Sequence, residues 1–566
     1  MRARVVGNTL TVRAIAGLHV VSLAWDFTAA PDFDAGVPQP LADLLGFAIE
    51  RRELGDQGEV IERYMLRGIK RFEAVDEGLA PGTPVRLDSH PVQSFLWADY
   101  TAKPETTYAY GVIPVHGTPK NLDVRHASAV SVQVTTEAEL GIDGAGATRH
   151  DIYFNRGVIG SQAYARRYQN AAPNPDRPLS KEMRWLSRGL YEGLKRFIAC
   201  AADGDALRCA FYEFHYRPVA RLLRAALDGG VDVQIVYDAE SSYEAENRAT
   251  LEAVGLDGPK IAFPRTVSEG IRHNKFIVLL KHDEPVAVWT GSTNISHGGI
   301  FGHSNVGHVI WDAAVAAKFL DYWKRLANDD TPSKLRAPNR AATPLPNGRP
   351  PAGVTPLFSA RDAADSNDTL QWYADRMADA REVVCLTVAF NLDPAFQTVI
   401  SRQNDVLRFI VKDDDLAQNE RIGSDRDVLF AAGGRLEAGA LANFLAERDN
   451  PLNRNDYIHT KFMLVDPLGD DPPVISGSAN FSKPSQRSND ENMLVIRGDT
   501  RVADIYFGEF MRIFDHHYAR YLVEKLQNEG RSDPSAGYLK TAAPDWLPAH
   551  FDARSPKSKR RRYFVG

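Results

Sequence analysis

Residues 1–135 alternate apolar and polar positions in short stretches, and clusters of Gly, Pro and Asp separate these stretches. A period of two is typical of β-strands with one buried face. Because several such stretches follow one another at short intervals, the pattern predicts an all-β sandwich. The expected strands span residues 9–15, 19–25, 46–51, 107–114 and 129–135.

From about residue 150 the apolar positions recur at the helical spacing of three to four residues. This spacing predicts a helix over 181–202. Beyond it, an apolar run at 209–214, a helical stretch at 219–226 and an apolar run at 231–237 give the order strand, helix, strand. This order favours parallel pairing in an α/β sheet.

The same order of elements returns later in the chain. A helix is expected over 369–380 and a strand over 383–390, followed by a helix over 394–401 and a strand over 407–411. The sequence therefore predicts an internal duplication of one α/β unit, whose two copies share pattern more than identity.

Breaks in the pattern suggest the domain organisation. Residues 331–356 hold seven prolines and are expected to form an extended linker. The basic residues near the C-terminus are expected to be disordered. The predicted segments are a β-sandwich (1–137), a first α/β half (150–330), the linker (331–356), a second α/β half (357–525) and a C-terminal extension with a basic tail (526–566).

The composition of the 566 residues is ordinary for a globular protein, which excludes a wholly disordered chain and a small disulfide scaffold. With 67 Lys and Arg against 73 Asp and Glu, the net charge of -6 excludes a generally basic nucleic-acid coat but not a local basic groove. Three cysteines in so long a chain favour a reducing compartment. No run resembles a signal peptide or a membrane span, so we expect a cytoplasmic protein without a transmembrane segment.

Each α/β unit carries the same pair of motifs. The first contains His273-Asn-Lys275 and the second His459-Thr-Lys461, each followed by an apolar run that predicts a strand. A glycine-serine turn with an asparagine follows, 19 residues from His to Ser in both copies (292 minus 273, and 478 minus 459). The period of a strand places each His and its Lys on one face. The turn residues are Ser292 and Asn294 in the first unit and Ser478 and Asn480 in the second.

This doubled set suits attack on a phosphodiester. Lysine and asparagine donors from both units can neutralise the non-bridging oxygens, and the serine hydroxyls and turn amides add further donors. One histidine can then attack phosphorus to form a phosphohistidine, while the other protonates the leaving oxygen. Because the side chains supply the positive charge, neither a metal ion nor another cofactor is expected.

These motifs resemble the paired HxKxxxxD and GSxN motifs of the phospholipase D superfamily, over roughly residues 150–525. The resemblance implies two similar α/β halves that share one active site. The matching residues of the first half are His273, Lys275 and Asn294, and those of the second half are His459, Lys461, Asp466 and Asn480.

The sequence departs from the family pattern in the first half. Position 280 is Leu where the motif has Asp. Relatives also carry a carboxylate that holds a catalytic histidine; Glu491 lies 32 residues after His459, but the equivalent position after His273 is Asn305. In two-domain relatives this group often reaches the opposite histidine. The resemblance thus implies that Glu491 serves His273, the nucleophile, and that Asn305 serves His459, the general acid.

Other features carry weaker expectations. The N-terminal strands resemble a fibronectin type III domain, with Trp25 as its buried tryptophan, and such a module is a candidate surface for a protein partner. His297, His303 and His308 are expected to be solvated loop histidines. Nothing in the sequence decides between a monomer and a homodimer.

The motifs identify the phosphodiester and not the groups attached to it. Two fused halves favour a phospholipase D-type enzyme acting on phospholipid, with either water or an alcohol as acceptor. The alternative is a nuclease of a defence or toxin type, for which the basic tail would bind phosphates. A second alternative is a catalytically degenerate binding scaffold.

Overall fold

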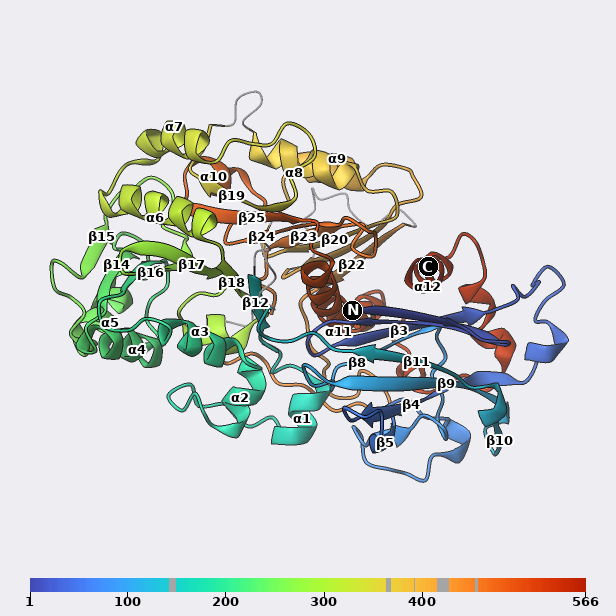
Figure 1. The fold of residues 1–566 in the computed structure, drawn as a ribbon. Coiled ribbons are helices and arrows are strands. Elements are labelled where there is room, and N and C mark those ends of the chain that lie inside the picture. The colour runs from blue at the N-terminus through green and yellow to red at the C-terminus, as the bar shows by residue number, and fades with distance from the viewer. Residues whose placement is uncertain (142–148, 363–367, 391, 415–426, 453–456) are drawn as a thin grey trace.

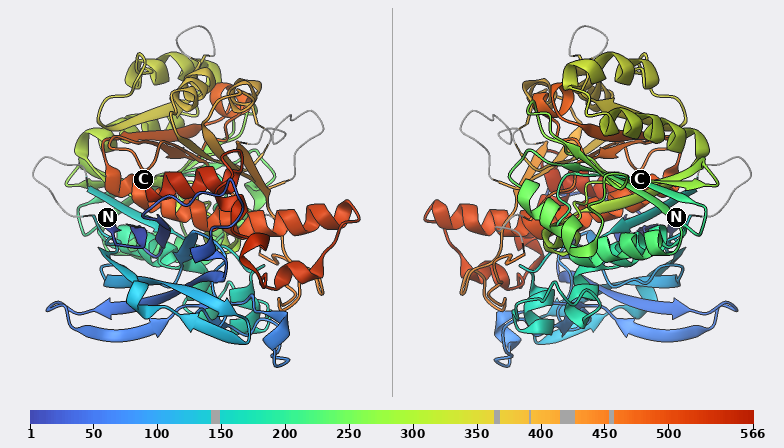
Figure 2. Two further views of the ribbon diagram at one scale, coloured as in Figure 1. Left: turned by 90° about the vertical axis from the view of Figure 1, so that its right-hand side faces the viewer. Right: turned by 90° about the vertical axis from the view of Figure 1, so that its left-hand side faces the viewer.

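The computed structural model describes residues 1–141, 149–362, 368–390, 392–414, 427–452 and 457–566. An N-terminal β-domain lies beside two α/β halves, each of which is built on a seven-stranded sheet (Figures 1 and 2). The predicted fold class, a duplicated α/β protein with an all-β N-terminal domain, is confirmed.

The N-terminal domain consists of two main antiparallel sheets around one apolar core. Trp25 is fully buried in this core and meets Phe47 edge-on, with ring centroids 5.3 Å apart. The first sheet has the order β1 (Arg2–Val6), β2 (Leu10–Ala16), β3 (Val21–Phe27) and β8 (Leu96–Asp99). The second has the order β10 (Asn121–Val124), β9 (Thr107–Thr118), β4 (Leu44–Leu54) and β5 (Val60–Met65), with β11 (Val130–Thr135) also paired to β9. A short pair is formed by β6 (Arg67–Gly68) and β7 (Val85–Arg86).

The first α/β half contains one sheet flanked by six helices. Its strand order is β12 (Arg149–Phe154), β18 (Val306–Trp311), β17 (Glu284–Gly291), β16 (Lys275–Lys281), β13 (Ala206–Phe211), β14 (Asp232–Asp238) and β15 (Ala262–Arg265). Its helices are α1 (Gln162–Tyr168), α2 (Lys181–Ser187), α3 (Leu190–Ile198), α4 (Arg217–Asp228), α5 (Glu244–Val254) and α6 (Ala313–Ala327).

The second half repeats this arrangement. Its strand order is β19 (Gly353–Ser359), β25 (Glu491–Arg497), β24 (Pro473–Gly477), β23 (Phe462–Val465), β20 (Val383–Val388), β21 (Leu407–Lys412) and β22 (Val428–Ala432). Its helices are α8 (Thr369–Ala378), α9 (Pro394–Ile400), α10 (Lys483–Arg487) and α11 (Thr500–Asn528). In each sheet the last three strands pair in parallel and the others antiparallel. The strands correspond one to one, so the predicted duplication is confirmed.

The single helix expected over 181–202 is wrong. Two helices, α2 and α3, cover the segment, because Arg188 and Gly189 between them adopt positive φ values of 45° and 90°. Glycine tolerates this conformation without steric cost. The break turns the Arg188 side chain inward, where it forms a buried ion pair with Glu509 of α11.

The extended linker expected over 331–356 is also wrong in part. The helix α7 (Pro332–Ala342) begins with a proline, where no amide proton is needed, and buries Leu335 and Asn339. Asn339 Nδ2 donates to the carbonyl of Ala360, 3.0 Å away. The segment therefore packs against the second half rather than acting as a spacer.

The basic tail is ordered rather than disordered. It forms α12 (Pro556–Val565), which packs against β3 of the N-terminal domain and buries Phe564 and Val565. Three of its five basic side chains form ion pairs: Lys559 contacts Asp427, and the guanidinium groups of Arg560 and Arg561 contact Asp515 and Asp26 respectively.

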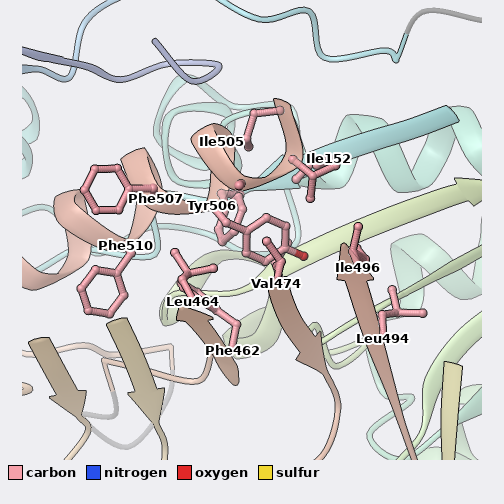
Figure 3. Close-up of a cluster of buried hydrophobic side chains, with 14 of the residues drawn as sticks. Ile152, Phe462, Leu464, Val474, Leu494, Ile496, Ile505, Tyr506, Phe507 and Phe510 are labelled. Atoms are coloured by element: carbon pink, nitrogen blue, oxygen red, sulfur yellow. The ribbon is translucent and has the colours of Figure 1, made fainter. Parts of the chain in front are cut away.

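The two halves share one hydrophobic core around α11 (Figure 3). Tyr506 of α11 lies against Phe154 of β12 and Phe462 of β23, with ring centroids 5.1 and 5.3 Å away. Its hydroxyl also lies 3.0 Å from Nδ1 of His308. One helix thus fixes the first sheet relative to the second. Within the described residues, no helix has the length and apolar character that crossing a membrane requires.

Candidate active site

The two His-x-Lys motifs lie at equivalent ends of equivalent strands. Lys275 is the first residue of β16, and Lys461 directly precedes β23, so each histidine lies just before its strand rather than within it. Each lysine ammonium donates to the carbonyl of its own histidine, at 2.5 Å in the first half and 2.7 Å in the second. These bonds fix both lysines beside the histidine rings. The ring centroids of His273 and His459 are 6.4 Å apart. The fold thus brings together in one site two motifs that lie 186 residues apart in the sequence.

The pairing of each histidine with its partner crosses between the halves, as expected from the sequence. Glu491 Oε2, at the start of β25, lies 2.9 Å from Nδ1 of His273. An ionised carboxylate only accepts hydrogen bonds, so Nδ1 of His273 carries the proton and Nε2 keeps a free lone pair.

His459 faces an amide instead of a carboxylate. Its Nδ1 lies 3.1 Å from Oδ1 of Asn305 and 3.2 Å from the carbonyl oxygen of Ser292. Asn305 Nδ2 donates to the carbonyl of Gly299, 2.7 Å away, which fixes the amide with its oxygen toward the ring. Nδ1 of His459 is therefore also a donor, and its Nε2 is the atom left for chemistry.

The motif serines support these partners. Ser292 Oγ donates to Asn305 Oδ1 and Ser478 Oγ donates to Glu491 Oε2, both at 2.7 Å. Each serine oxygen also accepts the backbone N–H of the residue that follows its partner. Val306 N–H donates to Ser292 Oγ at 3.1 Å, and Asn492 N–H donates to Ser478 Oγ at 3.0 Å. The serines thus orient the histidine partners from the opposite side.

Burial controls the electrostatics of the site. Desolvation lowers the pKa of His273 to about 4, although Glu491 opposes the change, and lowers the pKa of Lys275 to about 8. Desolvation and then the positive charge of Lys461 hold the pKa of His459 well below its ordinary value. The pKa of Lys461 is lowered by desolvation and by Lys275. Both imidazoles are therefore neutral near pH 7 before an anion enters.

Leu280, which stands where the family motif has Asp, lies away from this site. Leu280 is buried in the core near the far end of β16. The retained Asp466 follows β23 and accepts three backbone N–H groups, at residues 381–383, each at 2.9 Å. In the first half, Asp205 carries out a similar task by accepting from Ala202 N and Lys281 Nζ, both at 2.7 Å. The missing acid is thus replaced by a carboxylate directly before the neighbouring strand β13.

Two of the three histidines expected to be solvated are buried. His308 lies in β18, where its Nε2 is 2.8 Å from Nδ1 of His150. His303 stacks on the ring of His459 with centroids 4.5 Å apart and planes 22° apart. Burial lowers the pKa of His303 to about 3, so this ring presents a neutral face to His459.

Sequence reasoning missed one acid of the site. Glu213, two residues beyond β13, accepts a hydrogen bond from Nδ2 of the motif asparagine Asn294. No motif marks this residue, and the second half has no acid at the equivalent place. Only the pairing of β13 with β16 brings it beside the motif.

Residues 194–327 and 402–516 match the family model "Cardiolipin synthase, PLD-like domain", one match in each half. The chain therefore contains a phospholipase D-like domain, with one matched segment in each α/β half. Both matched segments contain their half's complete His-x-Lys and Gly-Ser-x-Asn motifs.

Solved structures resemble parts of this phospholipase D-like chain at low identity. Phosphatidylserine synthase from Haemophilus influenzae Rd KW20 is 15% identical, with 61% of this chain and 91% of that one covered and a TM-score of 0.41. Nuc, a phospholipase D family member from Salmonella typhimurium, is 22% identical (32% and 95% covered, TM-score 0.22). Yeast tyrosyl-DNA phosphodiesterase is 11% identical (51% and 82%, TM-score 0.30). No curated protein matches the chain. None of these likenesses determines the substrate.

Proposed function

We propose that this protein cleaves a phosphodiester through a phosphohistidine, with His273 as nucleophile and His459 as general acid. The observation that supports this best is the crossed pair of histidines, one facing a carboxylate and the other an amide, across 6.4 Å. Lys275, Lys461, Asn294 and Asn480 are the proposed donors to the non-bridging oxygens.

The first step forms a bond between Nε2 of His273 and phosphorus and breaks the bond to the leaving oxygen. When the anionic substrate enters, His459 takes up a proton from solvent at Nε2. It then gives this proton to the leaving oxygen, while its Nδ1–H stays hydrogen-bonded to Asn305 Oδ1. Glu491 compensates the positive charge that develops on His273. An amide oxygen stabilises an imidazolium less than a carboxylate does. Protonated His459, which faces the amide of Asn305, therefore gives up its proton more readily and suits the role of proton donor.

The second step reverses these roles. Water, or an alcohol, loses a proton to Nε2 of His459 and attacks phosphorus, and the bond to His273 breaks. The product is the phosphate monoester or the transferred diester, and both histidines return to their starting protonation states.

A phospholipid is the proposed substrate. Phe390 follows β20, at the end of the sheet where Lys461 lies, and 56% of its surface is exposed, which offers an apolar contact beside the site. Three of the five basic residues expected to bind nucleic acid, Lys559, Arg560 and Arg561, instead form ion pairs with acids of neighbouring elements. A tail committed to internal contacts gives little support to a polyanion substrate.

The test compares substrates in parallel, with chelator present. Cleavage of bis(p-nitrophenyl) phosphate is expected from the unaltered protein, together with release of headgroup from phosphatidylcholine vesicles and no cleavage of single-stranded DNA. Cleavage of DNA without headgroup release would identify a nuclease, and no turnover of any of the three would identify a scaffold.

The roles of the two histidines need a separate experiment. Phosphoenzyme trapped in the unaltered protein should carry its label on His273, and His273→Ala should abolish trapping. A label on His459 would reverse the assignment.

A further inference from the structure

Glu213 is a carboxyl group that the proposed mechanism leaves without a role. It contacts the amide nitrogen of Asn294, the group that we assign to the phosphate, and its carboxyl also bonds to the hydroxyl of Ser296. A negative charge beside a phosphate-binding amide opposes the binding of an anion. The presence of this acid in the site therefore needs an explanation.

The second half contains no matching acid. Phe211 pairs with Lys275 in the first sheet, and continuing the register of β20 with β23 places Val388 opposite Lys461. Two residues beyond these positions lie Glu213 in the first half and the exposed Phe390 in the second. Within the described part of the chain, Asn294 bonds to a carboxylate and Asn480 does not, so the duplication does not account for Glu213.

The charges that face Glu213 suggest its role. Lys275, Lys461 and His297 favour its ionised form, and Glu491 is the second carboxylate near the lysines. Asp413 acts on Lys461 from the other side. With neutral imidazoles, the two lysines face three carboxylates, Glu213, Glu491 and Asp413, before substrate binds. A phosphodiester then adds a further negative charge to a desolvated site, and protonation of one carboxylate offsets that charge.

The Asn294 amide is incompletely satisfied in the arrangement observed. Among the described residues no group donates to its buried Oδ1, while its Nδ2 is held by Glu213. A protonated carboxyl has an O–H that can donate to this oxygen once the amide has turned over. Such a turn would direct Nδ2 away from Glu213 and toward the phosphate.

We propose that Glu213 is a positioning residue that holds the Asn294 amide before substrate binds and takes up one proton from solvent when the phosphodiester enters. The proton moves to the Glu213 carboxyl, which then donates to Asn294 Oδ1 and leaves Nδ2 free for a phosphate oxygen. This inference rests on the proposed function, because it requires a phosphate in this site. Burial raises the pKa of Glu213, which makes the proton uptake easier.

The experiment measures binding of diphenylphosphinate, a monoanion with two phosphoryl oxygens and no ester bond to cleave. Calorimetry in buffers of different ionisation enthalpy should find, above the pKa of Glu213, about one proton per ligand more taken up by the unaltered protein than by Glu213→Gln. In the same pH range, below the pKa of about 8 of Lys275, the association constant of the unaltered protein should fall about tenfold more per pH unit than that of the variant. Binding by Glu213→Gln should remain tight, because the side chain is neutral throughout.

Two further variants separate the local effect from general electrostatics. Ser296→Ala removes a hydrogen bond that favours the ionised carboxyl, so the fall in affinity should begin at higher pH. Glu246→Gln makes the same change of charge at an exposed position near His215 and should leave the pH dependence unaltered.

The outcomes distinguish the two proposals. A proton uptake and pH dependence that are unchanged in Glu213→Gln, or a loss of affinity in that variant at every pH, would overturn the role of Glu213 while leaving the phosphate site in place. Failure of both the unaltered protein and Glu213→Gln to bind the phosphinate would overturn the proposed function and this inference with it.

Discussion

At the scale of single residues, the two histidines differ chiefly in the group that faces Nδ1. Asn305→Asp would give His459 a carboxylate like that of His273 and raise its pKa, which burial and neighbouring cations hold low. A general acid works only below its pKa, so the alkaline limb of kcat/KM should move to higher pH. The acid limb, which reflects neutral His273, should stay in place.

The same substitution should lower the maximal rate, because a weaker acid protonates the leaving oxygen more slowly. The carbonyl of Gly299 would also lose the hydrogen bond from Asn305 Nδ2, which should lower the free energy of unfolding by about 1–3 kcal/mol. The measurement is a pH–rate profile on bis(p-nitrophenyl) phosphate together with denaturant unfolding. An unmoved alkaline limb in a folded variant would contradict the assignment of His459 as the acid.

At the scale of elements, α12 shows how a segment judged by charge alone can be misread. Its four consecutive positions 559–562 are basic, yet Phe564 is 3% exposed and packs against Phe507 of α11, with ring centroids 5.3 Å apart. Phe564→Ala should lower the free energy of unfolding by about 3 kcal/mol through the cavity it leaves. Chemical denaturation measures this, with the exposed Arg562→Ala as control, expected within about 0.5 kcal/mol of the unaltered protein. Equal effects of the two variants would show that the helix does not contribute to the core.

Element types were predicted well where the apolar period is strong, as in the strands that became β14 and β21. Predictions failed where the backbone conformation or the burial of a few residues decides the structure against the overall residue pattern of the segment. Two residues with positive φ divide the helix expected over 181–202, and burial of Leu335 organises a proline-rich segment into α7. The motif residues of the site were identified because the duplication repeats them. Glu213 was not, since its place depends on strand pairing and Phe390 occupies the equivalent position.

At the scale of the whole molecule, the site exists only while both halves hold their relative position, and α11 fixes that position. Tyr506→Ala should remove ring contacts to Phe154 and Phe462 together and cost about 3–5 kcal/mol. Because one core spans both halves, hydrogen exchange should lose protection by similar amounts in β12 and β23.

Tyr506→Phe provides the matched control, since it keeps the ring and removes only the hydroxyl. His308 Nδ1 and Ser476 Oγ would lose that partner, so a smaller cost of about 1–2 kcal/mol is expected, with turnover largely preserved. If Tyr506→Ala lowered protection in β23 alone, the halves would unfold independently. A shared site would then require more than this helix to hold His273 and His459 at their present separation, and the interface between the strand ends, where Thr290 Oγ1 donates to Asn492 Oδ1, would be the remaining candidate.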